Sequence, residues 1–179
     1  MKLFDTNWKK ILLLIVISMA IFGAWEMGME RFYEKALVGA SNVVLKVVKN
    51  DTRIELEKNG IGDSYQFRVY TRIDGKKGNY PQETGGLLEP FVIVLSWQLF
   101  LFFVLNSKSA AKLLGINVTV FVFFQLLFLI FLSNYYSSAI QQFLFDMMLD
   151  NFYIVALILV IKDNMLYPVF RNKGDKSRN

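Results

Sequence analysis

Two pairs of acidic residues have a spacing that brings carboxylates together. Asp146 and Asp150 are four residues apart, as are Glu26 and Glu30, so each pair would lie on one face of a helix. A cation-binding or partner-binding role is the functional interpretation of Asp146 and Asp150. The simpler interpretation, which we favour, is that two solvated acids stabilise the start of a helix, where the helix dipole attracts negative charge.

The other candidate functional residues are two amides and one segment that contains aromatic and basic side chains. Gln98 and Gln125 lie near the middle of long apolar stretches, where an amide usually hydrogen-bonds to a neighbouring helix with about 0.6–2 kcal/mol. We favour that role over a substrate or ion contact. In the segment from Tyr65 to Ile73, apolar and polar residues alternate, which is typical of a β-strand. Its candidate partner-binding residues are Phe67, Arg68, Val69, Tyr70 and Arg72.

The absence of cysteine and histidine limits the possible chemistry. With neither residue among its 179, the chain has no thiol nucleophile, no imidazole base and no Cys or His metal ligand. Carboxylate-only metal binding and Ser/Lys chemistry stay open on composition. We predict that the protein is not an enzyme and that it binds no cofactor and no metal. The basic residues (net charge +5) lie mainly beside apolar stretches, which suits membrane orientation better than nucleic-acid binding.

Four apolar stretches must position these residues. They cover Ile11–Met27, Leu87–Leu105, Leu113–Leu132 and roughly Phe143–Ile161, and each is near the ~20 residues that a helix needs to cross a bilayer. The prediction is a mainly α, multi-pass membrane protein with four spans. Starting the last span at Phe143 places Asp146 and Asp150 near the outer interface. Starting it at Asn151 would bury Lys162 and Asp163, which is costly, so we prefer the earlier start.

Basic residues predict the orientation of these spans. Lys2, Lys9 and Lys10 precede the first span, Lys108 and Lys112 lie in the link between the second and third, and the C-terminal tail is basic. The positive-inside rule therefore puts both termini in the cytoplasm, most naturally at a bacterial inner membrane. The predicted units are residues 1–28, the N-terminus and first span; 29–86, an outer module; 87–170, a three-helix bundle; and 171–179, a basic tail.

The outer module is predicted to combine one helix and one β-hairpin. An amphipathic helix from Glu30 to Asn50 precedes two alternating segments, Arg53–Glu57 and Tyr65–Ile73. Asn59-Gly60-Ile61-Gly62 is the turn signal between them, and Asp74-Gly75 follows the second. The composition of Lys76–Gly86 indicates a loop.

This layout resembles that of the small membrane proteins associated with exosortase H. The matching pieces are the first span from Lys9 to Gly28, the outer module from Glu30 to Ile73, and the three spans from Leu87 to Phe170 with their basic link. That family has a Pro-Phe-Gln pattern in its third span, which is reduced here to Phe123-Phe124-Gln125. Its second span has an Asn-Pro and Gly-Leu-Pro run, which is replaced here by the segment from Thr84 to Pro90. The resemblance implies an accessory role beside an exosortase-like transpeptidase and transfers no catalytic residue.

The function expected from these features is that of a non-enzymatic accessory or assembly subunit in a protein-sorting or export system. Its partners would be membrane lipid and another integral membrane protein, or further copies of itself, and no nucleic acid. The alternative is a small oligomeric channel or transporter-like subunit, in which acids and amides would line a pathway.

Overall fold

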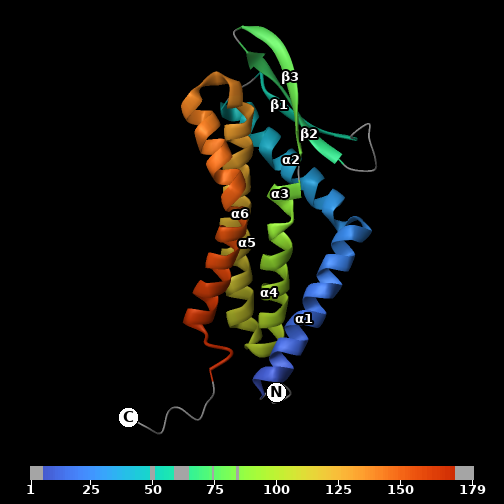
Figure 1. Cartoon of the computed structure of the whole chain (residues 1–179), viewed down its shortest axis with the longest axis vertical. Coiled ribbons are helices and arrows are strands. Elements are labelled where there is room, and N and C mark those ends of the chain that lie inside the picture. The colour runs from blue at the N-terminus through green and yellow to red at the C-terminus, as the bar shows by residue number, and fades with distance from the viewer. Residues whose placement is uncertain (1–5, 49–50, 59–64, 74, 84, 172–179) are drawn as a thin grey trace.

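The computed structural model describes residues 6–48, 51–58, 65–73, 75–83 and 85–171. It is mostly helical, with one small sheet at one end of a helical bundle (Figure 1). The helices are α1 (Asn7–Ala24), η1 (Trp25–Met29), α2 (Glu30–Val48), α3 (Gly85–Leu88), α4 (Pro90–Val104), α5 (Ser107–Ser133), η2 (Tyr135–Ser137) and α6 (Ala139–Leu166). The strands are β1 (Arg53–Lys58), β2 (Tyr65–Ile73) and β3 (Lys76–Glu83).

The first span and the amphipathic helix form one bent rod. The π-helical turn η1 joins α1 to α2, and inside it Gly28 has φ of 117°, a value that side-chain-bearing residues rarely adopt. The bend turns α2 away from the line of α1 and beneath the sheet (Figure 1). The predicted amphipathic helix is therefore confirmed as α2, and glycine permits the change of direction.

Within the described residues, two helical rods are long and apolar enough to cross a membrane, namely Asn7–Val48 and α5. The helix α6 would be a third if its two halves, which meet at an angle of 52°, make one span. Helix α4 is apolar but has only 15 residues, fewer than the ~20 of a typical span. A membrane protein is thus supported, whereas the arrangement of four spans stays a prediction.

The two ends of the described chain meet at the end of the bundle opposite the sheet (Figure 1). The Asn7 side chain donates a hydrogen bond of 2.8 Å to the carbonyl of Phe170, and Lys10 donates to the carbonyl of Val169. The Phe170 ring stacks on Phe100 at 5.8 Å. The segment after α6 therefore folds back and ties α6 to α1 and α4.

The sheet has three antiparallel strands in the order β1-β2-β3, so the predicted two-stranded hairpin was incomplete. Ile73 is opposite Lys76, and between them Gly75 has φ of 78°. The predicted turn between β1 and β2 lies outside the described residues. The segment Lys76–Glu83, predicted to be loop, is strand β3. Its Pro81 is tolerated because β3 is an edge strand, where a missing N–H breaks no ladder.

One face of the sheet packs on the helices. Ile54, Phe67 and Val69 have no exposed surface, and Tyr80 is buried beside them. The Tyr80 ring meets the edge of Tyr136 at 4.9 Å, and its hydroxyl donates to the carbonyl of Leu132 at the end of α5. This apolar layer is the anchor that a small sheet needs in order to be stable.

Candidate functional site

The sheet exposes its opposite face, and we call the side chains there the outer sheet face. Because side chains alternate along a strand, the neighbours of the buried residues point away from the bundle. Most of them are charged or hydrogen-bonding groups and none is fully buried. The outer sheet face consists of Arg53, Glu55, Glu57, Gln66, Arg68, Tyr70, Arg72, Lys77, Asn79 and Pro81.

Glu57 organises one half of the outer sheet face. Its carboxylate accepts a hydrogen bond of 2.7 Å from the Tyr70 hydroxyl and another from Arg68. The bond from Tyr70, and secondarily the Arg68 guanidinium, hold the pKa of the Glu57 carboxyl below its usual range. The same bond raises the pKa of the Tyr70 hydroxyl. Arg68 also donates to the Asn79 side chain at 2.9 Å, so this half is already paired within the chain.

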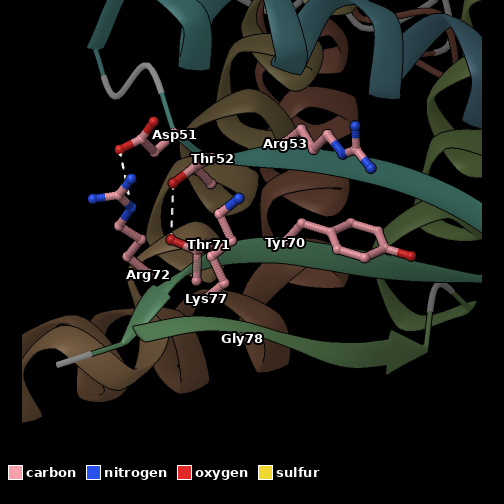
Figure 2. A pocket seen from close by; sticks show the side chains of 8 residues that line it. All are labelled: Asp51, Thr52, Arg53, Tyr70, Thr71, Arg72, Lys77 and Gly78. Atoms are coloured by element: carbon pink, nitrogen blue, oxygen red, sulfur yellow. Dashed lines mark hydrogen bonds and ion pairs between the residues drawn. The ribbon is translucent and has the colours of Figure 1, made fainter. Parts of the chain in front are cut away.

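Side chains of the other half line a cavity of about 390 Å³, together with Thr52, Thr71 and Gly78 from the bundle side of the sheet (Figure 2). Arg72 pairs with Asp51 at 3.2 Å, and the Thr52 and Thr71 hydroxyls, both nearly buried, are 2.8 Å apart. The Arg53 guanidinium lies over the Tyr70 ring, 4.9 Å from its centre. The lining residues are Asp51, Thr52, Arg53, Tyr70, Thr71, Arg72, Lys77 and Gly78.

The structure divides the predicted partner-binding residues between the two faces. Arg68, Tyr70 and Arg72 lie on the outer sheet face, where a partner can reach them. Phe67 and Val69 are fully buried against the helices and cannot touch a partner in the folded protein. Their inclusion in the contact surface is corrected, since the apolar side of an alternating strand is the side that the bundle covers.

A second group of polar residues lies inside the bundle, and we call it the Asp163 cluster. One carboxylate oxygen of Asp163 accepts hydrogen bonds from Gln98 at 2.8 Å, Asn117 at 2.6 Å and Trp97 at 3.1 Å. The other oxygen lies 3.1 Å from the Lys162 ammonium, an ion-pair distance without hydrogen-bond alignment. Lys162 also donates to the Asn117 side chain.

The last span was given its early start because burial of Lys162 and Asp163 is costly, and the structure nevertheless buries Asp163 among the helices. Asp163 has no exposed surface, because helices α4 and α5 place three donors around its carboxylate. An isolated buried charge is costly, but one that is paired and hydrogen-bonded is much less so. Sequence reasoning missed Trp97 and Asn117 as partners of Asp163, and the available signal was an acid, next to Lys162, directly after a long apolar stretch.

The remaining predicted residues are separate from both groups. Gln125 is fully buried, accepts a hydrogen bond from Tyr33 of α2 and donates one of 2.8 Å to the Leu87 carbonyl, so it joins α5 to α2 and α3. Asp146 is exposed on α6, and the Asp150 side chain lies outside the described residues. Within the described part of the chain, no three acidic residues gather where they could hold a metal ion.

Comparison of the chain with protein-family models, curated proteins and solved structures found no match. The functional argument therefore depends on the two polar regions. The Asp163 cluster has its donors directed at its own carboxylate. The outer sheet face has side chains that are accessible and could bind something else.

Proposed function

We propose that this chain is a multi-pass membrane protein that acts as a non-enzymatic accessory or assembly subunit, and that its outer sheet face contacts the partner. The observation that carries this proposal is the group of accessible basic and aromatic side chains on that face, with Arg53, Tyr70, Arg72 and Lys77 around one cavity. Arginine and tyrosine are among the residues enriched at protein interfaces.

The predicted orientation puts this face outside the cytoplasm, with both termini inside at a bacterial inner membrane. The partner would then be another integral membrane protein, or a second copy of this chain, with an extracytoplasmic surface. The resemblance to exosortase-associated proteins favours an exosortase-like transpeptidase as that partner. The bundle would hold the sheet at a fixed height above the membrane.

Affinity purification in a mild detergent tests the proposal. The tagged full chain is expected to recover a partner, and the double variant Tyr70→Ala, Arg72→Ala should lose most of it. The matched control is Lys76→Ala, an exposed residue beside the cavity that does not line it. Unchanged recovery by a folded double variant would contradict the assignment of the contact surface. Phe67 and Val69 are unsuitable for this test because their substitution would disturb the core.

A further inference from the structure

We infer that the cavity of the outer sheet face binds a carboxylate-bearing segment of the partner protein. This inference rests on the proposed function and adds the chemistry that the partner must present. The cavity walls carry three cations, Arg53, Arg72 and Lys77, and one carboxylate, Asp51. An acidic peptide segment is the complementary occupant of a protein contact that has such an excess of positive charge.

The three cations differ in whether they already form an ion pair within the chain. Arg72 has Asp51 as its partner, and Arg53 pairs with Glu55 at 3.1 Å. Lys77 is exposed and has no ion pair within the described part of the chain. Because exposed ion pairs contribute little, an incoming carboxylate could exchange with Asp51 at Arg72 and use Lys77 without competition.

Two threonines also line the cavity, from the bundle side of the sheet. Thr71 follows outward-facing Tyr70, so alternation directs its side chain toward the bundle, and both Thr52 and Thr71 are nearly buried. Their hydroxyl oxygens are 2.8 Å apart, so the two side chains bond to each other. Figure 2 shows this pair between Arg72 on one side and Lys77 on the other. The outward-facing cations are therefore the groups that would meet a carboxylate.

The size of the cavity favours a peptide over a single small anion. About 390 Å³ lies within the range of pockets that enclose ligands of drug size. A lone phosphate or carboxylate would leave most of that space to water. Two or three residues of a peptide would fill more of it, with the Tyr70 ring and the stem of Arg53 as the apolar surface.

Binding of a fluorescent peptide to the full chain in uncharged detergent micelles tests the inference. The probe is a short peptide of alternating Asp and Gly, and its control has Asn for every Asp. We expect the acidic probe to bind and the Asn probe not to bind. Lys77→Gln or Arg72→Gln should weaken binding about tenfold, as loss of one charge-assisted hydrogen bond does. Lys76→Gln removes the same charge beside the cavity and should leave affinity within about twofold.

Three results would overturn the inference. The first is that the acidic and Asn probes bind equally well. The second is that Lys77→Gln and Lys76→Gln weaken binding of the acidic probe equally. The third is that the probe does not bind, whereas vesicles containing anionic lipid bind the protein in a way that depends on Lys77. The last result would assign the cavity to lipid headgroups. If the probe fails while the purification experiment still recovers a partner through Tyr70 and Arg72, the proposed function stands and only the acidic chemistry is wrong.

Discussion

The outer sheet face and the Asp163 cluster contain similar side chains in opposite situations. Around Asp163, an acid, a lysine and two amides are directed at one another inside the bundle. On the sheet, arginines, a lysine and a tyrosine surround an open cavity. The buried groups must pair within the chain because an unpaired buried charge is severely destabilising. The exposed groups are under no such constraint.

This difference separates residues that hold the fold from residues that can bind a partner. Exposed ion pairs such as Arg72 with Asp51 contribute only about 0–1 kcal/mol, so a partner can replace them at little cost. A ligand that entered the Asp163 cluster would first have to break bonds that support three helices. Polar residues in this protein are therefore best assigned by whether their neighbours already satisfy them.

The largest effect is expected from Asp163→Ala. Removing the carboxylate leaves Trp97, Gln98 and Asn117 without their acceptor, and Lys162 loses its counter-charge. We expect the free energy of unfolding to fall by about 3–5 kcal/mol, measured by thermal or denaturant unfolding in detergent.

Asp146→Ala is the matched control, since it removes an exposed acid from the same helix and should change stability by less than about 0.5 kcal/mol. If Asp163→Ala prevents purification, Asp163→Asn keeps one acceptor oxygen and should give an intermediate loss. Equal stability of the Asp163 and Asp146 variants would show that the two regions do not differ as described.

A smaller effect is expected where the bundle meets the sheet, at Asn42 of α2. Its side chain accepts from the Ile54 amide and donates to the Ile54 carbonyl, both at 2.8 Å. It therefore covers an otherwise open edge of β1. Asn42→Ala should cost about 1–3 kcal/mol and should speed hydrogen exchange of the Ile54 amide. Asn79→Ala, on the outer sheet face, removes a bond to half-buried Arg68 and should leave that exchange unchanged. Equal exchange in both variants would contradict this role of Asn42.

Alternation of residue types predicted β1 and β2 correctly, yet it did not reveal β3. The Asp74-Gly75 pair is a strong hairpin signal, and its described residue, Gly75, does lie between the paired strands β2 and β3. Gly78, Pro81 and the following glycines made Lys76–Glu83 look like a loop. The residue that anchors β3 is Tyr80, whose contacts with Leu132 and Tyr136 are far away in sequence. Tertiary contacts of this kind override local propensity.

The burial of Asp163 was unpredictable for a related reason. The cost of burying a charge was judged from one helix, where only Lys162 is close in sequence. The compensating donors come from α4 and α5, at separations of 46 to 66 residues. For the sheet, alternation separated Phe67 and Val69 from Arg68, Tyr70 and Arg72. It did not show that the bundle would cover the apolar side.

The smallest effect is expected from the hydrogen bond between Tyr70 and Glu57. Tyr70→Phe removes the hydroxyl donor that is the main cause of the lowered pKa of the Glu57 carboxyl. The pKa of Glu57 should therefore rise toward its ordinary value of about 4.3, with a part of the depression kept by Arg68. A pH titration of Glu57 followed by NMR measures this change. Tyr65→Phe, a tyrosine of the same strand, is the control and should leave the pKa of Glu57 unchanged.

The sign of this effect follows from linkage. Because the pKa of Glu57 is lower in the folded protein than in the unfolded chain, its contribution to stability is present above the unfolded pKa and is lost as pH falls through the folded pKa. Tyr70 acts at alkaline pH, because its pKa is higher in the folded protein than in the unfolded chain. Its contribution to stability is present below the unfolded pKa and is lost as pH rises through the folded pKa. The sheet should thus be most stable between the two titrations. In Tyr70→Phe, the loss of stability at alkaline pH should disappear, and the loss of stability at acidic pH should become smaller. An unchanged acidic loss would mean that Arg68 alone holds the Glu57 carboxylate.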